Sequence, residues 1–161
     1  MQSSFGSPHT MHISELIVWV LPPIAMYLTN AKITFSMMIL KHDGTPIATR
    51  VECVTTTLRM MLGLMLRRKI PDDYAMVFVF PEPKSDSIHA LFMRFPIDVI
   101  FLDKDKRVIE TARLNPWTGY KHVKNVSYVV EMNAGTSDRY GLVAGAELTF
   151  DIAATHINDH V

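Results

Sequence analysis

Short stretches of β-forming residues, separated by turn signals, constrain the fold of this sequence more than any other feature. After residue 52 they recur at residues 74–80, 89–95, 97–103, 107–114, 127–133 and 146–152. The first stretch, MILKHDGTPIATRVE, divides at Asp43-Gly44, a dipeptide that tolerates the positive φ angles of a tight hairpin turn. Seven or eight short strands of this kind favour an antiparallel sandwich or barrel over an α/β fold.

One amphipathic helix interrupts the strand pattern, and we expect it at about residues 56–68, before Pro71. Four apolar residues follow the i, i+3, i+4, i+7 spacing of one helical face: Leu58, Met61, Leu62 and Met65. The sequence therefore predicts an all-β or β-rich α+β domain. It would be sandwich-like, a partly closed antiparallel barrel of seven to nine strands with this one helix packed on it.

Composition limits the classes of function. The chain has 161 residues, enough for one domain with a sizeable core. Lys plus Arg and Asp plus Glu both number 16, so the formal charge is zero and the chain lacks the basic surface of a nucleic-acid binder. The single cysteine, Cys53, excludes an internal disulfide and fits a reducing compartment. We therefore expect a soluble, cytoplasmic protein without a nucleic-acid partner.

The first 36 residues differ from the rest. Their apolar run, Leu16 to Leu28, is shorter than the roughly 20 residues of a membrane-spanning helix and is broken by Pro22-Pro23. No Lys or Arg precedes it, as one would in a signal peptide. Three interpretations stay open. The segment is upstream sequence foreign to the native chain, which would then start at Met37 or Met38; or it is a membrane-surface anchor; or it is an extension that packs on the domain.

These observations predict a simple domain organisation. Residues 1–36 form the extension, residues 37–152 form a single β-rich domain, and residues 153–161 form a polar tail. A membrane is an expected partner only if residues 13–28 act as an anchor.

Charged residues inside the β-forming stretches are the candidate site residues. MRFPIDVIFLD, at residues 93–103, contains Arg94 and Asp98, and SYVVEMN, at residues 127–133, contains Glu131. A buried carboxylate costs several kcal/mol unless a cation and hydrogen bonds compensate it. Arg94 and Arg67 are the expected partners of these carboxylates.

Side chains alternate along a strand, and this alternation predicts the faces on which the carboxylates lie. Asp98 should share a face with Ile100 and Leu102. Glu131 should share a face with Val129 and Asn133.

Three interpretations of the charged cluster remain. The leading functional hypothesis is a non-enzymatic small-ligand-binding or accessory domain, whose partner is an unidentified small molecule or protein. Its candidate site residues are Arg67, Arg94, Asp98, Glu131 and the loop aromatic Trp117. The alternatives are a hydrolase or transferase that uses Asp98 and Glu131 as an acid–base pair, and a purely structural polar cluster. No motif indicates a cofactor or a metal, so neither is expected.

Three blocks of the sequence resemble a known family in their order and spacing. The blocks are GLMLRRKIPDDYAMVFVFP, FMRFPIDVIFLDKDKRVIE and YVVEMNAGTSDRYGLVAGAEL. They resemble the prokaryotic family called domain of unknown function 192, over roughly residues 38–152. The resemblance implies a single β-rich, sandwich-like barrel with a helix, and a native start near Met37 or Met38. It implies an architecture and no particular chemistry.

Overall fold

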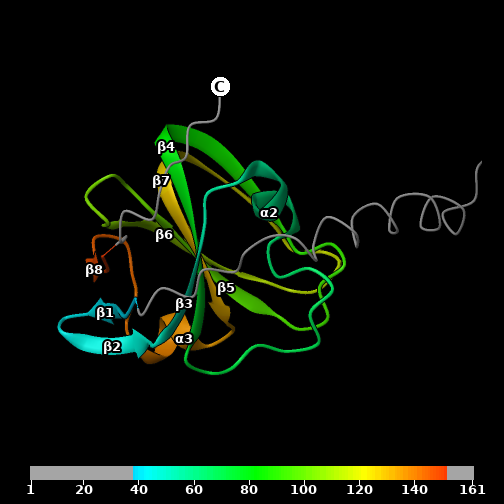
Figure 1. Cartoon of the computed structure of the whole chain (residues 1–161), viewed down its shortest axis with the longest axis horizontal. Helices are drawn as coiled ribbons and strands as arrows, with labels where there is room; N and C mark the ends of the chain where they lie inside the picture. Colours follow the sequence, from blue (N-terminus) through cyan, green and yellow to red (C-terminus); the bar gives the residue numbers. More distant parts are fainter. Residues whose placement is uncertain (1–37, 152–161) are drawn as a thin grey trace, which may run out of the picture. The chain divides into compact units, whose positions relative to one another are not determined.

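The computed structural model describes residues 38–151, which form two β-sheets with two short helices (Figure 1). The strands are β1 (Leu40–His42), β2 (Thr45–Ala48), β3 (Arg50–Val54), β4 (Tyr74–His89), β5 (Ile97–Leu102), β6 (Val108–Leu114), β7 (Tyr120–Asn133) and β8 (Leu148–Thr149). The helices are α2 (Thr57–Leu62) and α3 (Thr136–Arg139). The predicted β-rich, sandwich-like fold is confirmed. The predicted extension, 1–36, and tail, 153–161, lie outside the described residues.

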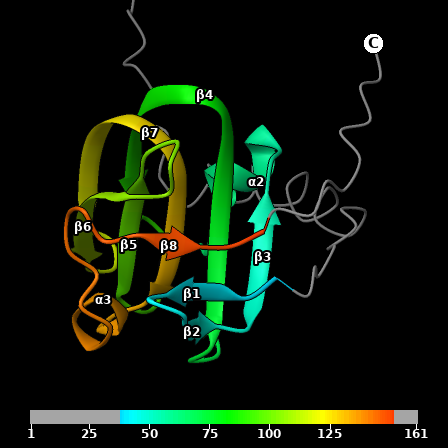
Figure 2. The same ribbon diagram turned by 90° about the vertical axis from the view of Figure 1, so that its left-hand side faces the viewer.

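The large sheet has the strand order β3-β4-β7-β5-β6, and the small sheet has the order β2-β1-β8. Figure 2 shows the small sheet on one face of the large sheet and α2 on the other. One buried cluster packs under α2 and includes Leu64, Met76, Phe78, Val99, Phe101 and Val129. A second lies between the sheets and includes Leu40, Ile47, Val77, Ile100, Val130 and Met132. The central strands are therefore buried on both faces.

The first hairpin is confirmed. β1 and β2 pair in antiparallel fashion around a turn in which Asp43 has φ 48° and Gly44 has φ 74°. Two successive positive φ angles are the geometry that the twist of a two-residue hairpin favours.

The large sheet contains one parallel pair, and here the expectation of a wholly antiparallel sheet is wrong. β3 and β4 run in parallel, with Arg50 opposite Tyr74. The segment between them carries α2 across the sheet. Parallel neighbours need a crossover of a dozen or more residues, and this connection provides it.

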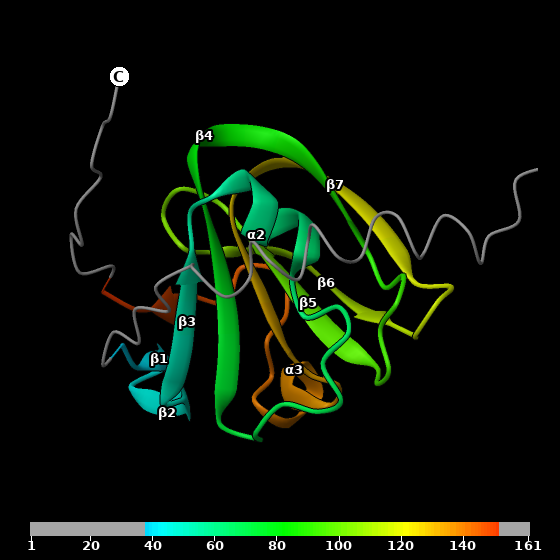
Figure 3. The same ribbon diagram turned by 45° about the vertical axis from the view of Figure 1, so that its right-hand side comes forward.

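β4 is longer than the sequence predicts, because residues 81–87 continue the strand rather than forming a polar loop. The register with β7 shifts between Val79 and Lys84, around Pro81 and Pro83. Prolines, which cannot donate to a ladder, are tolerated at such irregularities. The long curved pair of β4 and β7 is visible in Figure 3. Residues 90–95, predicted within a strand, form a turn and a bend instead.

The helix is shorter than predicted and buries a different face. α2 is followed at once by Gly63, whose φ is 46°, so the helical geometry ends there. Leu58 and Met61, predicted on the buried face, are 43% and 67% exposed. Met60 and the chain beyond the helix, at Leu64, pack on the large sheet instead.

Candidate ligand-binding site

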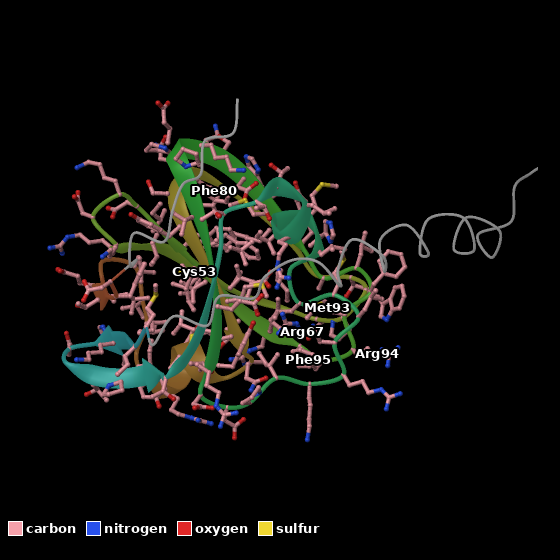
Figure 4. The ribbon with its side chains drawn as sticks, viewed as in Figure 1. Cys53, Arg67, Phe80, Met93, Arg94 and Phe95 are labelled. Carbon is pink, nitrogen blue, oxygen red and sulfur yellow. The ribbon has the colours of Figure 1, made fainter. Side chains whose placement is uncertain are left out.

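A pocket of about 470 Å³ lies between α2, the second half of β4 and the turn that follows β4. Its walls are mainly methionine and phenylalanine: Met60, Met61, Met65, Phe78, Phe80, Phe92 and Met93. Figure 4 marks two of them, Phe80 on β4 and Met93 in the turn. The polar groups of the lining include Lys84, Asp86 and His89 of β4, and Lys84 lies 3.5 Å from the Asp86 carboxylate. The volume and the apolar lining are typical of sites for small organic ligands.

Glu131 contributes a buried carboxylate to this pocket. It lies on β7 at the centre of the large sheet, opposite Met76 of β4 and Val99 of β5. The residue is only 5% exposed, and its Oε2 atom is buried without a hydrogen-bond partner. Buried polar atoms almost always have partners, so an exception in a pocket calls for an explanation.

The surroundings of Glu131 change its acidity. Burial raises the pKa of its carboxyl group to about 7, and the Leu64 backbone N–H and the charge of Arg67 offset that effect only in part. Glu131 is therefore partly protonated near neutral pH. A strongly shifted pKa inside a cleft is a frequent property of functional carboxylates.

Gly63 allows the chain after α2 to pass close to this carboxylate. A Cβ atom at Gly63 would lie 3.1 Å from Glu131 Oε2 and 3.5 Å from the Phe78 ring. The φ of 46° is also one that residues with a side chain rarely adopt. Glycine here both ends the helix and leaves room for Glu131.

Three bulky apolar residues around the pocket have left-handed backbone geometry: Leu66 (φ 65°), Phe92 (φ 58°) and Trp117 (φ 70°). Such geometry costs about 1–2 kcal/mol for each residue of this type. The Leu66 N–H donates to the Phe92 carbonyl at 3.2 Å, and the Trp117 N–H donates to the Ala90 carbonyl at 2.8 Å. The Phe92 and Trp117 rings meet edge to face at 5.2 Å. These contacts hold three separate segments together.

Asp98 forms a closed structural cluster. The residue is 1% exposed. Its Oδ1 accepts a hydrogen bond from Arg113 Nε at 2.9 Å, and its Oδ2 accepts from the backbone N–H groups of Gly135 and Ser137, both at 2.9 Å. Arg113 also donates to Asp138 at 2.7 Å. The cluster joins α3 to β5 and leaves neither Asp98 oxygen free for a ligand.

The predicted pairing of Arg94 with Asp98 is wrong. Arg94 is exposed and points away from the ribbon in Figure 4. Because the chain turns at residues 90–96, the alternation of a strand does not extend from Asp98 back to Arg94. Arg113 takes its place, since the register of β5 and β6 sets it directly opposite Asp98.

Arg67 pairs with a carboxylate that the sequence interpretation did not consider, Glu52 on β3. Arg67 Nη2 lies 2.9 Å from Glu52 Oε2, its Nη1 donates to the Tyr74 hydroxyl at 3.0 Å, and Arg59 of α2 also donates to Glu52. Burial raises the pKa of Glu52, but hydrogen bonds from Tyr74 and Arg67 outweigh it, so the net pKa is lowered. This polar cluster fastens α2 and the following turn to the large sheet.

The structure brings few of the predicted site residues together. Glu131 lines the pocket, Trp117 contacts the pocket residue Phe92, and Arg67 acts on Glu131 only through its charge. Asp98 lies on the opposite face of the sheet, because β5 and β7 align Val99, not Asp98, with Glu131. The carboxylates thus do not converge on one cleft.

Sequence reasoning missed most of the pocket. The helical spacing predicts Met61 and Met65 on the buried face of a longer helix and does not single out Gly63. Gly63 itself is the sequence feature that could have pointed to the pocket. An isolated glycine disfavours a helix and often marks a position where the backbone packs closely against another group. Nothing in the sequence indicates that Gly63 and Glu131 meet.

Comparison with solved structures supports the fold. A candidate transcription regulator from Sinorhizobium meliloti superposes with a TM-score of 0.63 and 25% identity, over 70% of this chain and 91% of that protein. A protein of unknown function from Novosphingobium aromaticivorans also gives a TM-score of 0.63, at 23% identity, over 70% of this chain and 82% of that one. Both are similar to this chain in architecture.

Sequence comparison identifies the family. A UPF0127 protein of Thermococcus sibiricus is 33% identical over 118 residues, 72% of this chain and 75% of the relative. A UPF0127 protein of Pyrococcus furiosus is 34% identical over 110 residues, 67% of this chain and 92% of the relative. The family model for domain of unknown function 192, described as "Uncharacterized ACR", matches residues 38–150. The chain therefore belongs to the family of domain of unknown function 192.

Proposed function

We propose that this domain binds a small amphiphilic molecule, with the apolar part in the methionine-lined pocket and a hydrogen-bond donor on Glu131. The observation that carries the proposal is the buried Glu131 Oε2, which has no partner inside a pocket of about 470 Å³. An unpaired buried polar group of this kind costs about 1–3 kcal/mol. A donor on the ligand would remove that cost and fix the ligand's orientation.

The charge of Glu131 favours an amine as the donor. Above its pKa of about 7 the carboxyl group is ionised and can accept a charge-assisted hydrogen bond from a protonated amine. Below that pKa the group is neutral and loses this attraction. The affinity for an amine should therefore rise as the pH increases through about 7.

The test compares matched ligands on the full chain by thermal shift and calorimetry. Alkylamines and phenylalkylamines are compared with alcohols and hydrocarbons of the same shape, at about pH 8, where Glu131 is ionised. We expect the amines to bind best, and Glu131→Gln to weaken their binding by about tenfold or more.

The matched control is Glu82→Gln, the same change at an exposed position of β4, which should bind as the wild type does. Equal amine affinity in the wild type and Glu131→Gln would contradict the proposal. So would a screen in which no amphiphile stabilises the wild type.

Acid–base catalysis is the second candidate function, since a carboxyl pKa of about 7 suits that role. The hydrolase or transferase expected from Asp98 and Glu131 together is not supported, because the two residues face opposite sides of the sheet. Any catalysis would rest on Glu131 with other pocket groups. Mass spectrometry of compounds recovered from the ligand screen separates the two functions: binding returns them unchanged, whereas catalysis alters them.

The cytoplasm is the proposed location, supported by the single cysteine. Within residues 38–151 no helix has the length and apolar character needed to cross a bilayer. Protease added to intact cells stripped of their wall should leave the protein whole, and lysis should expose it to cleavage. Cleavage before lysis would contradict this location.

A further inference from the structure

Five exposed apolar side chains form one surface beside the pocket, which we call the apolar rim: Met61, Leu66, Leu91, Phe92 and Trp117. Their exposed fractions are 67%, 44%, 44%, 44% and 58%. Met61, Leu91 and Phe92 also line the pocket, Trp117 contacts the Phe92 ring, and Leu66 is hydrogen-bonded to the Phe92 carbonyl. A contiguous exposed apolar surface commonly marks an interaction site.

Three residues of the apolar rim have strained backbone geometry. Six non-glycine residues have positive φ within residues 38–151. Three of them are polar residues, Asp43, Lys106 and Asn125. The other three, Leu66, Phe92 and Trp117, all belong to the apolar rim. Strain at bulky apolar positions is a reason to look for a function there.

Three cations lie within three residues of the apolar rim in the chain. Arg68 and Lys69 follow Leu66 in the chain, and Arg94 follows Phe92 by two residues. All three are exposed, and none has a salt-bridge partner within the part of the chain that the structure describes. The surface is therefore positive as well as apolar.

None of the acids near these cations in the chain forms an ion pair with them. Asp73 pairs with Arg50 at 3.3 Å, and Asp72 accepts a hydrogen bond from Asn133 at 3.3 Å. Asp98, four residues after Arg94, pairs with Arg113. A partner that complements the apolar rim must supply negative charge itself.

We propose that the apolar rim docks on the surface of an anionic lipid bilayer. Aromatic and aliphatic side chains bordered by Lys and Arg are the pattern with which proteins lie in a membrane interface. Trp117 and Phe92 would sit at the level of the headgroups, and Arg68, Lys69 and Arg94 would contact lipid phosphates. A polypeptide of acidic residues alone would satisfy the cations but leave the five apolar side chains in water, whereas an anionic bilayer supplies both negative charge and an apolar phase.

The experiment uses the full chain with Trp19→Phe. The sequence contains two tryptophans, so this change leaves Trp117 as the only indole. Vesicles of phosphatidylcholine alone are compared with vesicles that also contain phosphatidylglycerol. We expect the Trp117 emission to shift to shorter wavelength only with the anionic vesicles, and the shift to weaken as salt is raised.

Two single charge reversals provide the matched comparison. Arg94→Glu removes a cation from the edge of the apolar rim, whereas Lys104→Glu makes the same change on the exposed turn between β5 and β6. Arg94→Glu should weaken vesicle binding by about tenfold or more, and Lys104→Glu should bind as the parent does.

Several outcomes would overturn the proposal. Equal effects of the two reversals would mean that only net charge matters. Vesicle binding without a shift in Trp117 emission would place the contact elsewhere, for example at residues 13–28. If vesicles left the Trp117 emission unchanged but added poly-glutamate shifted it to shorter wavelength, the partner would be an acidic polypeptide instead.

Discussion

Asp98 and Glu131 lie on neighbouring strands, one residue out of register, and face opposite sides of the same sheet. Both are buried, with exposed fractions of 1% and 5%. Asp98 has a hydrogen-bond partner on each oxygen, whereas Glu131 Oε2 has none. Burial alone therefore does not set the two carboxylates apart. The partners of each oxygen do.

The largest effect is expected at the closed cluster. Asp98→Ala leaves the N–H groups of Gly135 and Ser137 without their acceptor and removes one of the two carboxylates that bind Arg113. The free energy of unfolding should fall by about 3–5 kcal/mol, because each unpaired buried N–H group costs about 1–3 kcal/mol. Denaturant melts measure this change. A loss below about 1 kcal/mol would show that Asp98 does not hold α3 to β5.

Glu131→Gln should have the next largest effect, in the opposite direction and only at higher pH. The folded pKa of about 7 lies above the carboxyl group's ordinary value of 4.5, so the folded state binds the proton more tightly. Glu131 thus contributes stability below about pH 4.5 that is lost as the pH rises through about 7. The variant should match the wild type at about pH 4 and exceed it by about 3 kcal/mol at about pH 8.

The same melts, run across this pH range, check the prediction. Glu82→Gln, the same change at an exposed position of β4, is the control. A constant difference between wild type and Glu131→Gln at all pH values would contradict a raised pKa.

Gly63→Ala should have an intermediate effect. The added methyl group would lie 3.1 Å from Glu131 Oε2, at a backbone φ of 46°. We expect a loss of about 1–2 kcal/mol in the free energy of unfolding. Gly44→Ala is a useful comparison, because its φ is also positive but nothing lies within 4 Å of its added Cβ. Equal losses would mean that backbone strain, rather than contact with Glu131, sets the effect.

Arg94→Ala should have the smallest effect on stability. The side chain is exposed and makes no ion pair within residues 38–151, so the change should stay within about 0.5 kcal/mol. Combined with Asp98→Ala, it should be additive, since the two residues share no partner. Clearly non-additive losses in the double variant would instead support an interaction between Arg94 and Asp98, as the sequence suggested.

Much of the fold could be predicted from the sequence because its signals are local. The Asp43-Gly44 turn and the alternation along β5 depend on neighbouring residues only. The parallel pairing of β3 with β4 and the passage of β4 through Pro81 and Pro83 depend on contacts with distant strands. Contacts between strands that lie far apart in the chain cannot be inferred from local patterns in a single sequence.

The candidate site was predicted less well for the same reason. Glu131 was selected because a carboxylate in a buried strand is unusual, and it does line a pocket. Its neighbours were expected from the order of sequence blocks alone. The actual partners of a buried carboxylate depend on which residues the strand register places opposite it and on where the connections between strands pass. Arg113 reaches Asp98 across the β5–β6 ladder, and Arg67 reaches Glu52 from the turn after α2.

The acidity of Glu131 tests the central distinction between the two carboxylates most directly. Carbon-13 NMR of the full chain, labelled at the glutamate side-chain carboxyl carbons, follows each carboxyl group through a pH titration, and Glu131→Gln assigns the signal. We predict one glutamate resonance that titrates at about 7 and disappears in the variant. A Glu131 resonance that titrates near the ordinary value of about 4.3 would contradict a buried, unpaired carboxylate in the pocket.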